Sequence, residues 1–279
     1  MKISFADAAK ADIVAFIVDE GDGLPGAAAD MDAASGGLLT EALSGARFDG
    51  KKDQQAVVVL PKGGDARRAV LIGGGKPKKR DARVFESLGA NLVKSHSKGG
   101  FRSMAVHVAG AEDAARVALG AKLAAYRFDT YFTKLKADQK PSLTNLTLIV
   151  DDVKAAKAAF APLDAAAEGT NLARTLVNLP PNDLYPESFA GRLKDLKEFG
   201  VEVEILGEKE MKKLGMGALL GVGQGSRKES QLGIMKWMGG AEGEDPVILV
   251  GKGVCFDTGG ISLKPGPGME DMRGDMGGA

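Results

Sequence analysis

The sequence predicts an α/β protein built around a mostly parallel or mixed sheet. Two observations lead to this prediction. Short runs rich in Val and Ile alternate with longer stretches that carry apolar residues at helical spacing, and these short runs have the composition of buried strands. Continuously apolar strands are typical of sheets covered by helices on both faces. The chain has 279 residues, which is long enough for two domains or one large one.

The first half of the chain contains the clearest alternation. Its predicted strands are residues 12–19, 56–61, 68–75, 103–110 and 143–152. Its predicted helices are residues 82–99 and 111–128, which have an apolar stripe with helical period. Together they predict a first α/β domain over residues 1–150.

A long Ala-rich stretch follows this domain. Residues 151–178 are predicted to form a connecting helix, with a break or kink at Pro162. The remaining residues, 179–279, are predicted to form a second, incomplete domain.

The second domain begins with a loop and then alternates again. Residues 178–190 are rich in Pro and Asn, and Pro186 suits the first turn of a helix that reaches about Phe199. Further predicted elements are a strand at 201–208, a short helix at 209–215, a glycine-rich turn at 221–226, and strands at 232–240 and 245–253.

Charge and composition disfavour several classes of partner. The 37 basic and 37 acidic residues cancel, so no field of one sign attracts nucleic acid or an anionic membrane. A single cysteine, Cys255, allows no disulfide within the chain and favours a reducing, cytoplasmic setting. No signal peptide and no apolar run of about 20 residues is found, so we expect no membrane association.

Several motifs have ordinary structural interpretations. In "GGGKPKKR", Lys76 precedes a proline instead of the Ser or Thr of a phosphate loop, so we expect turn glycines and a solvated basic turn. "GVGQGS" is likewise interpreted as a turn. Nothing places His96 or His107 beside a nucleophile, and Cys255 lies between apolar neighbours as a packing residue.

The segment 250–279 combines cationic and anionic side chains on a glycine-rich backbone. Lys252 directly follows an apolar run, so we expect a partly buried, neutral amine that can bind a metal. Asp257 and Asp275 offer hard oxygen ligands, as do the further candidates Glu270 and Asp271. Lys264 can remain charged and polarise a carbonyl. The alternative is a solvated surface loop of mixed charge.

This segment, "VGKGVCFDTGGISLKPGPGMEDMRGDMGGA", resembles the metal-binding segment of the leucyl aminopeptidases, a cytosolic metallopeptidase family. Residues 123–134 ("LAAYRFDTYFTK") and 171–190 ("NLARTLVNLPPNDLYPESFA") also resemble that family. The resemblance implies an N-terminal macro-like α/β domain, a connecting helix, and the first part of a mixed-sheet α/β dimetal peptidase domain. It also implies a homo-hexamer.

The resemblance implies a role for five residues. Lys252 matches a ligand of the more weakly held metal, Asp257 matches the carboxylate that bridges both metals, and Asp275 matches a further ligand. Lys264 matches the catalytic lysine that stabilises the oxyanion. Met272 matches a residue that lines the pocket for the first side chain of the substrate.

The implied reaction is removal of N-terminal residues, leucine preferred, from peptide substrates. Two divalent metal ions, Mn or Zn, share a water and lower its pKa, which supplies hydroxide at neutral pH. The family's "NTDAEGR" motif, whose arginine holds a bicarbonate, does not occur in this chain. The chain is therefore interpreted as an N-terminal fragment truncated inside the catalytic domain, and we expect it to be inactive alone.

Two other functions are alternatives to an aminopeptidase. Some bacterial relatives act as DNA-binding regulators, but zero net charge and the lack of a basic helix count against nucleic acid as a partner. A ligand-binding macro-like module formed by residues 1–150 is a third hypothesis, ranked last because no clear nucleotide loop is present. Titration with ADP-ribose tests it.

Overall fold

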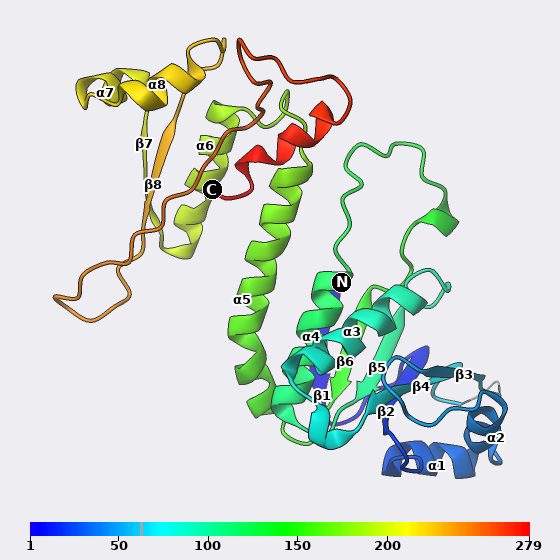
Figure 1. Cartoon of the computed structure of the whole chain (residues 1–279). Helices are drawn as coiled ribbons and strands as arrows, with labels where there is room; N and C mark the ends of the chain where they lie inside the picture. The colour runs from blue at the N-terminus through cyan, green and yellow to red at the C-terminus, as the bar shows by residue number, and fades with distance from the viewer. Residues whose placement is uncertain (62–63) are drawn as a thin grey trace. The chain divides into compact units, whose positions relative to one another are not determined.

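The structure of the protein is a computed structural model that describes residues 1–61 and 64–279. The chain divides into two compact units, Met1–Asn171 and Leu172–Ala279. Each unit combines helices with a sheet and has an apolar cluster of its own (Figure 1). The predicted mixed α/β class is therefore confirmed, and the units are described separately below.

The first unit contains a six-stranded sheet with the strand order β1-β6-β5-β2-β4-β3. The strands are β1 (Lys2–Ala6), β2 (Ile13–Asp19), β3 (Gln55–Val59), β4 (Arg68–Gly75), β5 (Ser103–His107) and β6 (Asn145–Ile149). Every neighbouring pair is parallel except β3 and β4, which are antiparallel. The sheet is thus mostly parallel, as the continuous apolar runs predict.

Side chains of the central strand β2 alternate between two apolar clusters, one on each face of the sheet. Ile13 and Ala15 belong to the cluster that includes residues of the helices α3 (Ala82–His96), α4 (Ala111–Ala124) and α5 (Val153–Asn178). Val14 and Phe16 belong to the cluster on the other face, which includes residues of α1 (Gly26–Ala34) and α2 (Leu38–Gly45). Helices on both faces explain why the central strand β2 is apolar from Ile13 to Val18 (Figure 1).

Parts of the first unit differ from the prediction. Strand β1 and helices α1 and α2 were not predicted, and α5 continues through Pro162 without a break. Arg80 is not part of a solvated turn. Its guanidinium is largely buried. It donates to the carbonyl oxygens of Gly74 and Gly75 and pairs with Asp19. Only the neighbouring lysines of this basic turn are exposed.

The second unit consists of short elements. Its antiparallel strands are β7 (Glu202–Leu206) and β8 (Leu232–Lys236), and its helices are α6 (Pro186–Asp195), α7 (Glu208–Lys213) and α8 (Gly217–Gly223). The 3-10 helices of the chain are η1 (Pro77–Lys79), η2 (Ala137–Gln139), η3 (Leu196–Phe199) and η4 (Met269–Met276). The predicted turn at 221–226 is in part helical, because α8 extends to Gly223.

The predicted strand at 245–253 is a second correction. These residues form no strand, and the side chains of Ile248 and Leu249 are exposed. The physical reason is that an apolar run forms a strand only with a hydrogen-bonding neighbour, and no strand among the described residues pairs with it. Among the described helices, none has both the length and the hydropathy needed to cross a membrane.

Candidate active site

Two buried side chains anchor the segment that carries the candidate site residues. Cys255 and Met276 belong to one apolar cluster of the second unit, together with Leu176, Leu184 and Phe189. Cys255 lies between Lys252 and Asp257 in the sequence, and Met276 directly follows Asp275. Burial of these two anchors therefore brings helix η4 against the 252–257 segment, although about 20 residues separate them.

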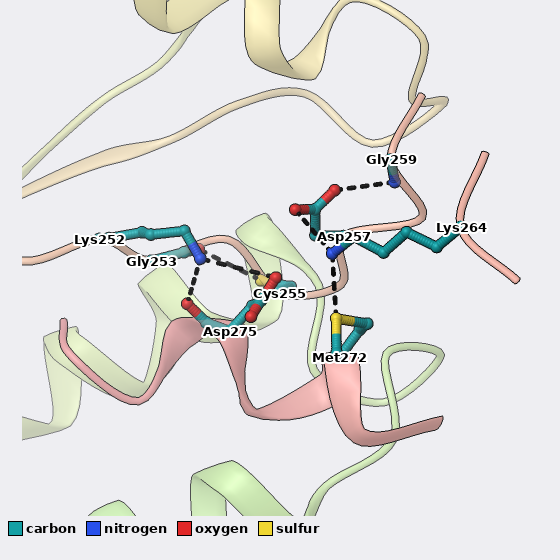
Figure 2. A network of polar contacts seen from close by, with 8 residues as sticks. All are labelled: Lys252, Gly253, Cys255, Asp257, Gly259, Lys264, Met272 and Asp275. Carbon is teal, nitrogen blue, oxygen red and sulfur yellow. Dashed lines mark hydrogen bonds and ion pairs between the residues drawn. The ribbon is translucent and has the colours of Figure 1, made fainter. Parts of the chain in front are cut away.

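Lys252 contacts Asp275 of helix η4. Its Nζ donates to the backbone carbonyl oxygen of Asp275 at 2.9 Å and lies 3.6 Å from the carboxylate oxygen Oδ2. Figure 2 shows the lysine extended along the segment with its amine directed at η4. The side chain of Lys252 is 58% exposed, so the expected partial burial is wrong. The physical reason is that no strand pairs with residues 245–253, which leaves the lysine stem uncovered.

Lys264 makes the second set of contacts in this network. Its Nζ lies 3.1 Å from Oδ2 of Asp257 and 3.0 Å from the sulfur of Met272 (Figure 2). The side chains of Lys264 and Asp257 are 35% and 41% exposed, so a ligand can reach both. Lysine, carboxylate and thioether thus converge from three parts of the segment 250–279.

A tight turn connects Asp257 to Lys264. The backbone N–H of Gly259 donates to Oδ1 of Asp257 at 2.9 Å, which is the hydrogen bond of an Asx-turn. The backbone N–H of Lys264 donates to the carbonyl oxygen of Thr258 at 2.9 Å and closes the loop. Both carboxylate oxygens of Asp257 therefore have a donor, one from the backbone and one from a side chain.

These donors favour the charged form of Asp257. The Gly259 N–H, then the Lys264 ammonium and, further off, Lys252 hold the pKa of the Asp257 carboxyl below its ordinary value. Burial has the opposite consequence for the thiol of Cys255, whose pKa it raises to about 11. Cys255 is therefore a neutral packing residue near pH 7 and offers no thiolate to a metal or a substrate.

The structure brings together all five predicted site residues, Lys252, Asp257, Lys264, Met272 and Asp275 (Figure 2). The further candidates Glu270 and Asp271 are exposed, and each contacts Arg273. Hydrogen bonds and ion pairs therefore single out one group within the charged segment.

The donor types of this group fit a divalent cation. Lys252 offers an amine nitrogen once a bound ion displaces its proton, and Asp257 and Asp275 offer carboxylate oxygens. Each carboxylate has a lysine ammonium beside it, which a bound cation would have to displace. The set is small: within residues 1–61 and 64–279, no three His, Cys, Asp or Glu side chains are grouped so that they could hold a metal ion.

Sequence reasoning missed two residues that build the site. Gly259 supplies an N–H to Asp257, and Met276 anchors η4 in the apolar cluster. The signal for Gly259 was the pair of glycines two residues after an aspartate, in "DTGG". Met276 had no comparable signal, because its burial depends on residues about 90 to 100 positions earlier in the chain.

The two histidines lie in the first unit. His96 is buried on α3, and His107 stacks on Phe16 with ring centroids 4.8 Å apart. Burial lowers the pKa of both, and for His96 the charge of Arg68 adds to this effect. The burial of His96 and the stacking of His107 are typical of packing residues.

Two family models match this chain. The model described as "Cytosol aminopeptidase family, N-terminal domain" matches residues 13–135. The model described as "Cytosol aminopeptidase family, catalytic domain" matches residues 171–279, which include the whole network around Asp257. Together the two models account for most of both units.

Curated relatives resemble the chain over nearly its whole length. A "Probable cytosol aminopeptidase" of Caulobacter vibrioides is 48% identical over 95% of this chain and 54% of its own length. A protein of the same name in Agrobacterium fabrum is 45% identical over 99% of this chain and 57% of its own length. The chain thus spans about half the length of the curated relatives it matches.

Solved structures agree with the fold. A tomato leucine aminopeptidase mutant superposes with a TM-score of 0.81 at 24% identity, over 100% of this chain and 57% of that one. The bottromycin maturation enzyme BotP in complex with Mn gives a TM-score of 0.73 at 28% identity, over 96% of this chain and 53% of that one.

Proposed function

Because this chain belongs to the cytosol aminopeptidase family, we propose that it contributes the N-terminal domain and part of the catalytic centre of a metal-dependent aminopeptidase. The observation that carries this proposal is the network formed by Lys252, Asp275, Asp257 and Lys264 within one segment. Its donor types suit a divalent cation, and the Lys264 ammonium suits a polarised carbonyl.

We assign the metal ligands of this chain to Lys252, Asp257 and Asp275. In the proposed enzyme they hold two divalent ions, Mn or Zn, together with ligands that these residues do not supply, and a bicarbonate accompanies them. When bound, such ions lower the pKa of a shared water and provide hydroxide at neutral pH. Support for the assignment comes from the closeness of Lys252 Nζ to the Asp275 carboxylate and from the exposure of the Asp257 carboxylate, which an ion can reach.

Lys264 is the proposed catalytic residue of this chain. Its ammonium is a mobile donor that can leave Asp257 and donate to the carbonyl oxygen of the scissile peptide bond. A cation there stabilises the negative charge that develops on that oxygen during hydrolysis. The exposure of Lys264 supports this role, because a peptide can reach its Nζ without repacking of the core.

Met272 is the proposed pocket residue. Its thioether touches Lys264, so an apolar side chain packed against this sulfur places its own carbonyl near the lysine. A flexible, polarizable methionine suits an aliphatic substrate side chain such as leucine. The proposed substrates are therefore peptides with an N-terminal leucine, and we propose a cytoplasmic homo-hexamer as the working form.

The 279-residue chain by itself is proposed to be inactive. A clamp of two metals needs both ions held about 3.5–4 Å apart. Lys252, Asp257 and Asp275 offer three donors to the two ions, and the described residues add no group of three or more His, Cys, Asp or Glu side chains. Three donors shared between two ions leave at least one ion with too few protein ligands.

Hydrolysis of leucine p-nitroanilide tests the proposal. The assay compares the 279-residue chain with a chimera in which the rest of the Caulobacter relative follows residue 279, each with added Mn or Zn. We expect turnover only from the chimera, loss of turnover with a chelator, and no cleavage of N-acetyl-leucine p-nitroanilide. A folded, metal-loaded chimera without turnover, or metal-dependent turnover by the 279-residue chain, contradicts it.

A further inference from the structure

The turn between Asp257 and Lys264 has a steric requirement at Gly259. The φ of Gly259 is +90°, a conformation that L side chains rarely adopt. A Cβ placed there would lie 2.3 Å from the carbonyl oxygen of Ser262 and 3.1 Å from Cγ of Lys264. The first of these atoms is backbone, so a side chain at position 259 forces the turn itself to open.

Gly259 also contacts both functional residues of the turn, Asp257 and Lys264. Its N–H holds Oδ1 of Asp257, and its Cα side faces the stem of Lys264. The loop closes beside it through the hydrogen bond from the Lys264 N–H to the carbonyl oxygen of Thr258. A single backbone position thus affects the direction of a carboxylate and of an ammonium.

We propose that Gly259 is a positioning residue that sets the Asp257 carboxylate and the Lys264 ammonium in their mutual arrangement before a metal or a peptide binds. This inference rests on the function proposed above, in which Asp257 is a ligand and Lys264 is catalytic. Pre-organisation of this kind removes the cost of ordering two flexible side chains at the moment of binding.

Gly260 provides a matched control in the same turn. Its φ is also positive, +64°, but a Cβ there meets no atom within 4 Å. Its N–H lies 3.4 Å from Oγ1 of Thr258, so it contacts neither Asp257 nor Lys264. Gly260→Ala therefore also places an L residue at positive φ, but without the collision and without loss of the N–H to Asp257.

The first experiment measures lysine reactivity in the 279-residue chain. Wild type, Gly259→Ala and Gly260→Ala are treated with limiting acetic anhydride, and each lysine is quantified by peptide mass spectrometry. We expect Lys264 to react several-fold faster in Gly259→Ala only, while Lys236 and Lys252 keep their wild-type rates. An unchanged Lys264 in Gly259→Ala, or an equal increase in Gly260→Ala, overturns the proposal.

A second measurement needs no glycine variant and covers the case in which Gly259→Ala fails to fold. Amide hydrogen exchange is followed by NMR in wild type and in Asp257→Asn. The Gly259 amide is expected to be protected in wild type and to lose at least part of that protection in the variant, while Met276 keeps its rate. Exchange of Gly259 at the unprotected rate in wild type contradicts the proposal.

Binding of Mn²⁺ alone, followed by the EPR signal of the free ion, separates this inference from the proposed function. We expect affinity to fall about tenfold in Gly259→Ala, the scale of one hydrogen bond to a charged group, and less than about twofold in Gly260→Ala. Mn²⁺ binding that is indifferent to Asp257→Asn refutes the ligand assignment, whereas the reactivity and exchange data still decide the role of Gly259.

Discussion

Lys264 and Asp257, seven residues apart in the sequence, form an ion pair with 3.1 Å between Nζ and Oδ2. The pair joins the proposed catalytic cation to the proposed bridging ligand. An exposed pair of this kind contributes little to stability, because water screens both charges. Its value is therefore positional, and substitution of Lys264 or Asp257 is expected to change chemistry more than folding.

Replacement of Lys264 by alanine should lower kcat of the chimera without changing its metal content. One donor to an oxyanion contributes about 2.7–4 kcal/mol in other enzymes, so the expected loss is about 10²–10³-fold. Steady-state kinetics and metal analysis check this. Lys236→Ala, an exposed lysine on β8, serves as the control and should keep wild-type kcat. Normal turnover by Lys264→Ala would remove the catalytic assignment.

Asp257→Asn should release more metal from the chimera than Asp275→Asn. Asp257 is assigned as the ligand shared by both ions, and its two oxygens have separate donors that hold its direction. Asp275 is assigned to one ion and already pairs with Lys252. Metal content after gel filtration measures the difference. Equal retention by the two variants would show that the ligand roles are wrong.

The first unit depends on a close contact between α3 and α4, and Gly120→Ala should disrupt it. A Cβ at Gly120 would lie 1.8 Å from the carbonyl oxygen of Glu86, a backbone atom that cannot move aside. Overpacking of this kind costs about 1–3 kcal/mol.

The control for this prediction is Gly169→Ala in helix α5, where a Cβ meets no atom within 4 Å. That substitution should raise the free energy of unfolding by about 0.5–1 kcal/mol, because alanine is the better helix former. Urea unfolding of both variants provides the measurement. A Gly120→Ala protein as stable as wild type would argue against the α3–α4 packing.

The pKa of Cys255 predicts a loss of stability at high pH. Burial raises the pKa of this thiol from 9.0 to about 11, so the unfolded chain loses the proton first as pH rises. The stabilisation is fully present below pH 9 and disappears as pH passes 11, with a total of about 2–3 kcal/mol.

Lysines and tyrosines also titrate in this range, so the informative quantity is the difference between wild type and Cys255→Ala. Urea unfolding at pH 8, 9, 10 and 11 should show the two free energies of unfolding converging as pH rises. Curves that stay parallel would mean that the thiol is not buried in the folded protein.

Much of the first unit could be predicted from local patterns. Strands β2 and β4 are long, apolar and central, so each carries its own signal. Strand β1 has five residues and owes its place to pairing with β6, as in the register of Phe5 with Leu148. That pairing is non-local, and no pattern within residues 2–6 predicts it.

In the second unit, a strand was predicted where the structure has none. The run at 245–253 has the composition of a strand, yet Leu249 is exposed, since composition does not supply a neighbouring strand. At the site, the residue types of Asp257 and Lys264 pointed to chemistry. Their contact depends on the hydrogen bonds of the turn between them, whereas the packing of η4 through Met276 spans about 100 residues of chain.

The most direct test of the proposed centre is anomalous diffraction at the manganese edge from crystals of the chimera grown with Mn²⁺. We expect two anomalous peaks, one within about 2.5 Å of Lys252 Nζ and an Asp275 carboxylate oxygen, and both in contact with the Asp257 carboxylate. Peaks elsewhere in the protein, with the Lys252–Asp275 and Lys264–Asp257 pairs unbroken, would contradict the assignment of this segment as the metal centre.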